Sequence, residues 1–437
     1  MASGNPFKQV LDIRRDEWAG ALLMFSYFFL VITTFWILKP LKKSLFIGHY
    51  VADGIDILGS HFSAPQAEMI AKIGNMFVAF FAAALFAYLS RYLRREKLTY
   101  AFTGLIIAIY LVFRITLLEP HGAAVWSFYI FGDIYNTLML AAFFAFLNDS
   151  TSPAQGKRLY GLIVLGGVAG GAVGSSFVAA AVGDLSLTTW LTICTGIALV
   201  IAVLAGFAAR SLKLPEEVPN AVKEPPLVGN AATEGARLVF GSRYLLSIVA
   251  IVGLYEMVST IMDFQFTSAV VHYVDGPDLG EYFSRVFAFT NMFGLVVQLL
   301  FASFILTRFG QTVALLVMPI AALTGSVGFM IVPGLLVGSS LNTLDNGFNY
   351  SINQSAKELL YTATSRVEKY SAKAFIDMFV QRFAKAVAVG LSLAITTFFT
   401  GFESVRWLSI LTATILLAWI FIARYAGRTF DELTDER

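Results

Sequence analysis

Residues 18–44 read WAGALLMFSYFFLVITTFWILKPLKKS, and this stretch decides the fold class. Its apolar part, which ends at Leu38, is long enough for a helix that spans a bilayer, since such a helix needs about 20 apolar residues. Three lysines follow at its end: Lys39, Lys42 and Lys43. Charges at membrane depth cost roughly 2.5–3.5 kcal/mol each, so they persist where they face a polar cavity. This cluster therefore suggests an anionic solute; the alternative is that the lysines reach an outer membrane interface.

The composition of the whole chain indicates a polytopic membrane protein. Of its 437 residues 57% are hydrophobic and only 14% are charged, whereas soluble proteins carry about 25% charge. The single cysteine, Cys194, excludes an intrachain disulfide and argues against a cysteine-based metal site. HExxH, CxxC, GxSxG and P-loop patterns are absent, and so is a cleavable signal peptide. We expect no cofactor, no metal, no enzymatic activity and no nucleic-acid partner.

Apolar segments of spanning length recur along the chain and predict an all-α polytopic membrane protein with twelve transmembrane helices. The candidate spans lie at about 18–38, 66–90, 99–118, 122–147, 159–183, 188–210, 244–271, 281–306, 310–332, 334–355, 374–400 and 402–424. A polar, proline-containing linker at 211–243 divides them into six-helix bundles at 1–210 and 244–437. This is the layout of the major facilitator superfamily, in which the substrate binds at the midplane and the halves rock to give alternating access.

Lysine and arginine alternate between the two sets of loops and predict the orientation. The loops 49–65, 119–121, 184–187, 272–280 and 333 contain neither residue. The termini and the opposite loops hold cations that include Lys8, Arg14, Arg15, Arg91, Arg94, Arg95, Lys157, Arg158, Lys213, Lys223, Arg366, Lys369 and Arg428. The positive-inside rule places both termini in the cytoplasm. We expect a monomer in the lipid bilayer of a bacterial inner membrane.

Acidic residues within the spans are candidates for the functional site. Asp133 lies near the middle of the fourth span and Glu256 near the middle of the seventh, so each half supplies one. Each acid is expected to pair with a lysine in the empty state, or to take up a proton and couple transport to it; a purely structural ion pair is the alternative. Asp263 lies seven residues beyond Glu256 on the same helical face, as a second cavity group or an interface residue.

Polar residues in the last third of the chain suggest further contacts. The tenth span carries an asparagine stripe, because the helical period places these residues on one face: Asn342, Asn346, Asn349 and Asn353. Their amides either hydrogen-bond a base or sugar or join helices. Arg382 and Lys385 indicate either a phosphate cavity or pairing with Asp377. Tyr27, Tyr135 and Phe264 are candidates to stack on a base. Five glycines of the fifth span predict close helix packing: Gly166, Gly167, Gly170, Gly171 and Gly174.

Four stretches together carry a family resemblance. They are Lys39-Pro-Leu-Lys-Lys43, Gly132-Asp133, Tyr255-Glu-Met257, and residues 349–377 with Lys357-Glu-Leu-Leu-Tyr361 and Glu368-Lys-Tyr-Ser-Ala-Lys-Ala-Phe-Ile-Asp377. The chain resembles the ATP/ADP translocase family of plastids and intracellular bacteria. That family has Arg-Asp-Thr-Lys-Asp, Glu-Leu-Trp, Val-Glu-Val and Lys-Gly-Lys-Ala-x-Ile-Asp at these places.

The resemblance implies a secondary active transporter of nucleotides, either an ATP/ADP exchanger or a related carrier. It implies that Lys42, Asp133, Glu256 and a lysine among Lys357, Lys373 and Lys385 handle the substrate. With the candidates found above, the predicted substrate-binding set is Lys39, Lys42, Lys43, Asp133, Glu256, Asn346, Asn349, Lys357, Lys373 and Lys385. Charge balance or coupling falls to Asp133, Glu256 and Asp263.

Differences from the family pattern keep other functions open. Pro40 and Lys43 stand where the family has aspartates, Asp133 where it has glutamate, and Asn349 where it has lysine or arginine. The alternatives are another nucleotide, proton coupling, another anionic solute on the same fold, or a non-transporting scaffold or lipid-handling enzyme. A lipid-handling enzyme needs an activated nucleophile or a metal site, and the sequence shows neither.

Overall fold

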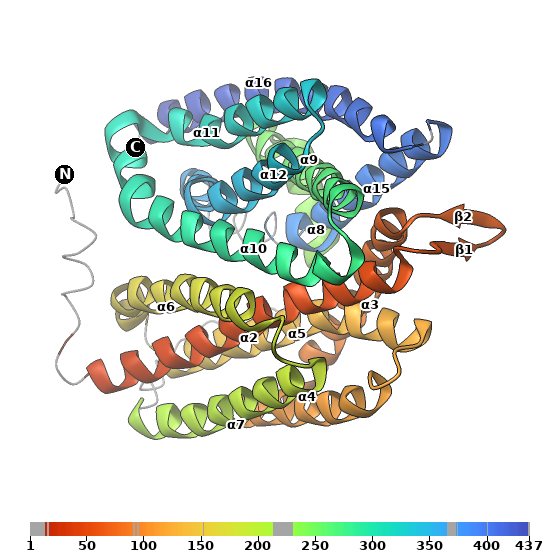
Figure 1. Cartoon of the computed structure of the whole chain (residues 1–437). Coiled ribbons are helices and arrows are strands. Elements are labelled where there is room, and N and C mark those ends of the chain that lie inside the picture. Colours follow the sequence, from red (N-terminus) through yellow and green to blue (C-terminus); the bar gives the residue numbers. More distant parts are fainter. Residues whose placement is uncertain are drawn as a thin grey trace. The chain divides into compact units, whose positions relative to one another are not determined.

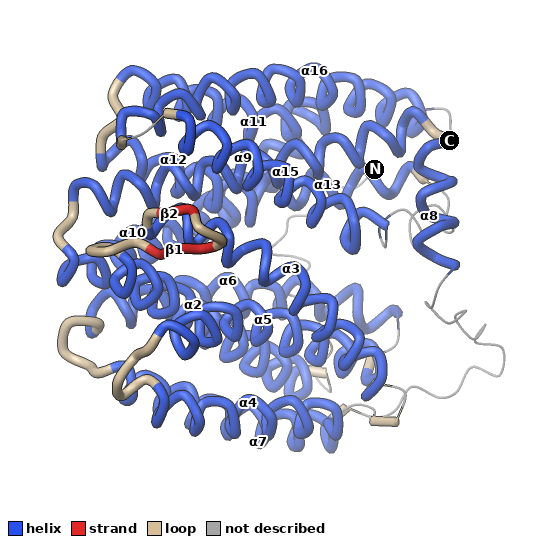
Figure 2. Tube along the Cα trace, turned by 90° about the vertical axis from the view of Figure 1, so that its right-hand side faces the viewer, coloured by secondary structure: helices blue, strands red, loops and turns tan. Residues whose placement is uncertain are grey.

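The computed structural model describes Arg14 and residues 17–90, 92–93, 96–151, 153–212, 230–364, 373, 375–399 and 401–435. The described chain is almost entirely helical (Figure 2). Some predicted features lie outside it, namely residues 213–229 of the linker, the family-like residues 368–372 and 374, and the side chain of Asp377. The same holds for the side chains of Lys8, Arg15, Arg91, Arg94, Arg95, Lys157, Arg158, Lys213, Lys223, Arg366 and Lys369.

The helices confirm a multi-pass membrane protein. Within the described ranges, ten helices are long and apolar enough to cross a membrane. The two other predicted spans, 334–355 and 374–400, are helical over most of their described residues and are divided into shorter elements. The first comprises α12 (Leu335–Phe348), the π-helix η3 (Asn349–Asn353) and α13 (Gln354–Leu360). The second comprises the π-helix η5 (Ile376–Val380) and α15 (Gln381–Phe398). Short π-helical segments inside α-helices occur frequently at functional sites.

The chain folds into two compact units. Unit 1 combines residues up to Ala64 with 74–222 and 276–291, and unit 2 combines 65–73, 223–275 and 292–437, as far as these are described. Two helices therefore contribute residues to both units: α3 (Ala64–Leu89) and α10 (Leu279–Val296).

Unit 1 is built around one long helix, α2 (Trp18–Tyr50) (Figure 1). Its other elements are β1 (Ile55–Ile57), β2 (Ser60–Phe62), α4 (Glu96–Thr116), α5 (Gly122–Ser150), α6 (Pro153–Ala181), α7 (Leu187–Ser211) and the 3₁₀ turn η1 (Gly276–Asp278). Helix α2 packs against α5, α6 and α7. The predicted glycine packing is confirmed, because a Cβ on Gly166 or Gly174 would lie 2.8 or 2.6 Å from a backbone oxygen of α2. Only glycine lets the two helices approach so closely.

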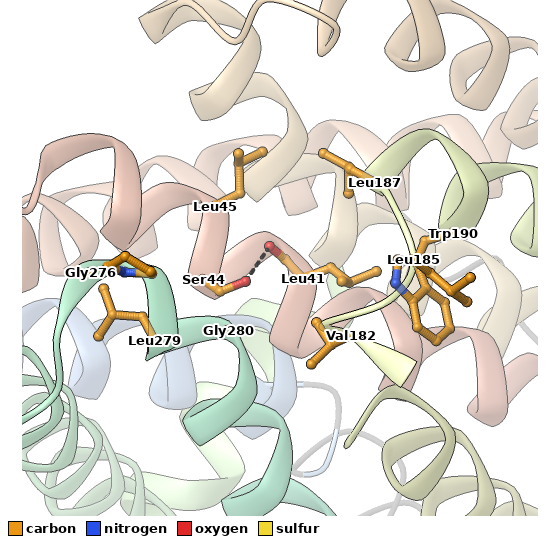
Figure 3. Close-up of a pocket in the computed structure, with 11 residues that line it drawn as sticks. Leu41, Ser44, Leu45, Val182, Leu185, Leu187, Trp190, Gly276, Leu279 and Gly280 are labelled. Carbon is orange, nitrogen blue, oxygen red and sulfur yellow. Dashed lines mark hydrogen bonds between the residues drawn. The ribbon is translucent and has the colours of Figure 1, made fainter. Parts of the chain in front are cut away.

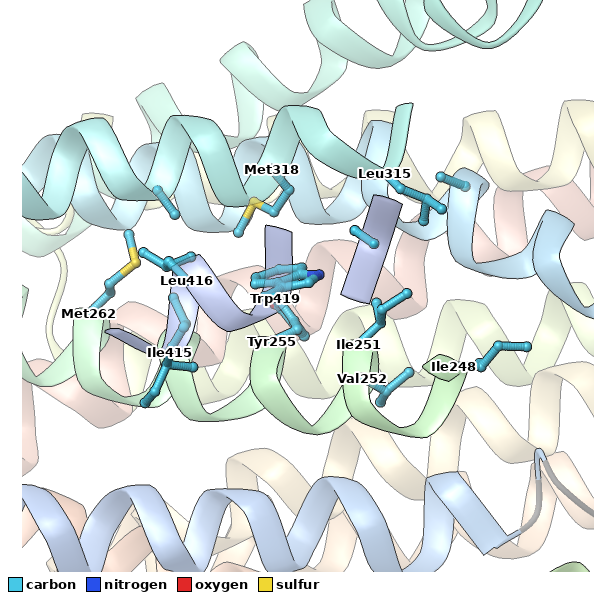
Figure 4. Close-up of a cluster of buried hydrophobic side chains, with 14 of the residues drawn as sticks. Ile248, Ile251, Val252, Tyr255, Met262, Leu315, Met318, Ile415, Leu416 and Trp419 are labelled. Carbon is cyan, nitrogen blue, oxygen red and sulfur yellow. The ribbon is translucent and has the colours of Figure 1, made fainter. Parts of the chain in front are cut away.

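Unit 2 has its own apolar core between α9 (Arg243–Tyr273), α11 (Ser303–Ile331) and α16 (Leu408–Asp435). Figure 4 shows Tyr255 of α9, Met318 of α11 and Trp419 of α16 meeting there. The remaining elements of the unit are α8 (Asn230–Gly241), the π-helix η2 (Val297–Ala302), and the 3₁₀ turns η4 (Tyr361–Ala363) and η6 (Phe402–Trp407). These two separate cores give each unit a rigid frame for its polar residues.

Local structure departs from the expected boundaries in four places. Helix α2 runs through Pro40 to Tyr50, although proline removes a helical hydrogen bond, because buried neighbours on both sides hold it. The predicted loop 49–65 contains an antiparallel hairpin that pairs Ile55 with Phe62. The predicted linker contains α8, and the predicted break between spans eight and nine falls at Gly310, whose φ is 82°. Glycine adopts this φ without the strain of a Cβ.

Candidate functional site

In unit 1, Lys42 of α2 pairs with Asp133 of α5. The lysine Nζ lies 2.5 Å from Oδ1 of the carboxylate, and the Asn75 side chain of α3 donates to Oδ2. The same Nζ lies 4.6 Å from the ring centroid of Tyr129, one turn before the aspartate. A Cβ on Gly132 would lie 2.5 Å from the lysine Cδ, so glycine provides the space. The predicted pairing is confirmed, and burial of Lys42 argues against its reaching an outer interface.

The other two lysines of the cluster lie against aromatic rings of unit 1. Lys39 Nζ lies 4.3 Å from the Trp36 ring centroid and 5.1 Å from that of Phe287, and Lys43 Nζ lies 5.5 Å from that of Phe283. A cation over a ring gains roughly 0.5–2 kcal/mol, depending on how far water is excluded. Lys43 is buried like its neighbour, so aromatic faces help to keep these charges within the helices.

In unit 2, Lys385 of α15 pairs with Glu256 of α9, with 3.2 Å between Nζ and Oε2. Lys357 of α13 lies on the ring of Tyr255, the residue before Glu256, 4.8 Å from its centroid. The pairing expected for Glu256 is therefore confirmed. Lys385 makes an ion pair with Glu256, and the alternative pairing with Asp377 lies outside the described side chains.

Asp263 pairs with Lys72, from the part of α3 that belongs to unit 2. Lys72 also lies 3.9 Å from Glu68, a buried acid one turn earlier on α3. Asp263 is therefore bound to another helix in this state. Its proposed part in charge balance requires that this pair open.

The asparagine stripe bonds along its own helix. Asn346 Nδ2 donates to Oδ1 of Asn342 at 2.9 Å, and Asn353 Nδ2 donates to Oδ1 of Asn349 at 3.0 Å. Asn342 and Asn353 are buried. Because these contacts lie within one helix, they do not show the predicted joining of helices. Substrate contacts by Asn346 and Asn349 stay a prediction.

Lys373 lies in a different ion pair from Lys385. Its Nζ donates to both oxygens of Glu358, at 2.6 and 2.7 Å, and lies 5.7 Å from the Tyr361 ring centroid. Of the three lysines proposed for unit 2, Lys385 and Lys357 gather at Tyr255 and Glu256, whereas Lys373 pairs with Glu358.

The suggestion that Tyr27, Tyr135 and Phe264 stack on a base is wrong for this structure. All three are buried in the apolar cores of their units. The Tyr27 hydroxyl bonds with Thr99 at 3.0 Å, and the Tyr135 hydroxyl donates to the carbonyl of Val31 at 3.2 Å. A high aromatic content makes core packing the default for any one ring.

Sequence reasoning missed several partners of the charged residues. Asn75 is a single amide in an apolar span, a signal of a buried polar contact that we overlooked. Lys72 lies within the predicted second span, but the sequence did not match it with Asp263. Tyr129 and Phe287 carry no distinguishing signal among the chain's many aromatic residues, because their ring contacts depend on how the helices are rotated.

A cavity of about 270 Å³ opens beside the lysine cluster, between Leu41 and Ser44 of α2, Leu185 before α7, and Gly280 of α10 (Figure 3). Its walls are mostly apolar, and none of the predicted site residues lines it. It is therefore a poor site for a polyanion. Within the described residues, no cluster of histidine, cysteine and acidic side chains is suited to hold a metal ion.

A family comparison decides the identity of this arrangement. The family described as TLC ATP/ADP transporter matches residues 121–335 and 330–430, which include Asp133, Glu256 and Lys385. The chain belongs to the TLC ATP/ADP transporter family. The resemblance seen in the short motifs is thereby confirmed.

Two chlamydial relatives agree with the TLC assignment. The ADP,ATP carrier protein 2 of Chlamydia trachomatis is 23% identical over 504 residues, which cover 97% of this chain and 90% of that protein. The protein of the same name from Chlamydia pneumoniae is 23% identical over 212 residues, covering 43% and 39%.

Solved structures confirm the major-facilitator-like fold. The nucleoside transporter NupG has a TM-score of 0.63 at 15% identity, covering 92% of this chain and 98% of that chain. A bacterial homologue of the human lysosomal transporter Spinster, inward-facing and unoccupied, has a TM-score of 0.57 at 12% identity, covering 96% and 99%. At these identities the likeness concerns the fold alone.

Proposed function

We propose that this TLC family member is a secondary active transporter of nucleotides, an ATP/ADP exchanger or a related carrier, and not an enzyme. One observation carries the proposal: each unit holds a lysine–carboxylate pair within its membrane helices, with further lysines beside it on aromatic rings. Family membership and the two ADP,ATP carrier relatives support the substrate class.

The pairs suggest how a polyanion is bound and released. Lysine ammonium groups neutralise phosphate oxygens as point charges. When a substrate phosphate pairs with Lys42, Asp133 loses its cation. It keeps the hydrogen bond from Asn75, which lowers the cost of breaking the ion pair. Glu256 and Lys385 are proposed to exchange partners in the same way. Alternating access then needs no covalent step.

Uptake into proteoliposomes tests this function. Purified protein is reconstituted, and labelled ATP, ADP and other nucleotides are offered with and without internal nucleotide at several pH values. We expect saturable nucleotide uptake that Lys42→Gln and Glu256→Gln abolish while both variants stay folded. Normal uptake by both variants would refute the site assignment; stimulation by internal nucleotide distinguishes exchange from ion-coupled uptake.

A second candidate is a carrier of another anionic solute on the same fold. Lys43 favours it, because this position is an aspartate in the family pattern and here adds a buried cation. If the vesicles take up no nucleotide, phosphorylated sugars and dicarboxylates are offered to them to test for another anionic substrate. Saturable uptake of one of them that depends on Lys42 would establish this alternative, whereas no uptake of any solute would favour a non-transporting scaffold.

We also propose that both termini are cytoplasmic in a bacterial inner membrane, that the protein is a monomer, and that the functional halves are 1–210 and 244–437. Leu58, fully exposed at the hairpin tip, then lies outside. Because Cys194 is buried, a membrane-impermeant maleimide in intact cells should label Leu58→Cys and spare Phe240→Cys in α8. The opposite pattern would reverse the orientation.

A further inference from the structure

A small hollow lies on the surface of unit 1 between α4 and α7, which pack side by side (Figure 1). It measures about 210 Å³ and is lined by Tyr100 of α4 and by Val203, Gly206, Phe207 and Arg210 of α7. A Cβ on Gly206 would lie 2.6 Å from the Tyr100 hydroxyl oxygen. Glycine therefore lets the phenol rest against the backbone of α7 and leaves the hollow open.

The hollow continues an apolar face of α7. Leu199, Val200, Val203 and Phe207 are all about half exposed. Their spacing of three to four residues puts them on one side of the helix, in line with Arg210. Exposed apolar side chains on a membrane-spanning helix are in contact with acyl chains.

Cations gather where this face ends. Arg210 is exposed in the last turn of α7, and Lys97 is exposed in the first turn of α4. The backbone N–H groups at the start of α4 add partial positive charge. Glu96, in the same turn as Lys97, is an acidic neighbour, and the carbonyl groups at the end of α7 carry partial negative charge. The side chains of Arg210, Lys97 and Glu96 together leave one net positive charge.

We propose that this hollow is a binding site for an anionic phospholipid. The Arg210 guanidinium binds the headgroup phosphate through its paired N–H donors, with Lys97 nearby. The Tyr100 hydroxyl lies at the level of the glycerol esters, and an acyl chain lies along Phe207 and Val203. With the orientation proposed above, the lipid belongs to the cytoplasmic leaflet, where anionic lipids attract basic groups. The site is separate from the charged pairs assigned to transport.

Native mass spectrometry of the purified full chain tests the proposal, with phosphatidylglycerol, phosphatidylcholine and inorganic phosphate as probes. We expect phosphatidylglycerol to bind in preference to phosphatidylcholine, and Arg210→Gln to weaken that binding about fivefold. Gly206→Val should weaken it as well, because its side chain fills the hollow. Arg114→Gln is the matched control, since Arg114 is an exposed arginine at the opposite end of α4 and does not line this hollow.

The outcomes separate clearly. Weaker phosphatidylglycerol binding by Arg210→Gln but not by Arg114→Gln supports the site, even if Gly206→Val does not fold. Equal binding of the two lipids, or equal loss in both arginine variants, overturns it. Binding of inorganic phosphate alone with the same dependence on Arg210 also overturns it, because the site would then take a soluble anion. Each variant's thermal unfolding in phosphatidylcholine alone verifies that it is folded.

Discussion

The charged pairs of the two units are built with opposite polarity. In unit 1 the lysine is the buried partner: the Lys42 side chain is 7% exposed and that of Asp133 is 41% exposed. In unit 2 the acid is buried: the Glu256 side chain is 12% exposed and that of Lys385 is 47% exposed. Each unit thus holds one charge firmly within its helices and presents the opposite charge at a more accessible position.

This difference teaches which half of each pair the fold depends on. Removing the accessible partner strands a buried charge, which costs several kcal/mol, whereas removing the buried partner leaves a charge that water can solvate. Lys42→Gln and Glu256→Gln should therefore spare the fold. These are the two variants proposed to abolish transport, so their transport defects should not arise from misfolding.

The largest expected effect is on the stability of unit 1. Asp133→Asn leaves Lys42 buried without its carboxylate and should lower the free energy of unfolding by about 3–5 kcal/mol. Lys42→Gln should cost about 1 kcal/mol or less, since Asp133 is partly exposed and keeps its Asn75 donor. Denaturant unfolding in detergent measures both variants. Equal losses in the free energy of unfolding would show that the burial of Lys42 does not decide which substitution costs more.

A smaller effect of the same kind is expected in unit 2. Lys385→Gln leaves Glu256 without its lysine and should cost about 2 kcal/mol, less than Asp133→Asn because the Glu256 side chain is 12% exposed and that of Lys42 only 7%. Glu256→Gln should cost less than Lys385→Gln, because Lys385 is half exposed. The same unfolding measurement applies. A greater loss for Glu256→Gln would contradict the comparison.

The smallest effect is expected when Asp263 is removed from the third pair, in which neither partner is strongly buried. The Lys72 and Asp263 side chains are 23% and 25% exposed. Asp263→Asn should cost about 1 kcal/mol, because Lys72 keeps Glu68 within 3.9 Å. Lys72→Gln should cost more, since it removes the cation that buried Glu68 shares. If Asp263→Asn proves as costly as Asp133→Asn, partial exposure does not protect a pair at this depth.

Close helix packing and the pairing of the two central acids were predictable from local pattern. Glycines at small spacings in α6 predicted its approach to α2, because a missing Cβ acts directly where two helices touch. Asp133 and Glu256 were predicted to pair with lysines, because an ion within the membrane needs a counter-charge. The partner of Asp263 was not predicted, since Lys72 lies 191 residues away in the chain.

By itself, the sequence determined that this is a helical multi-pass membrane protein and which charged residues lie within its helices. Hydrophobic length and residue type are local properties, so they can be read without a structure. Only the tertiary structure decided that Lys42 and Glu256 are the buried partners, that the asparagines bond along their own helix, and that Tyr27 and Tyr135 belong to the core. Burial and pairing depend on how each helix is rotated against its neighbours, and that rotation is set by packing across the whole unit.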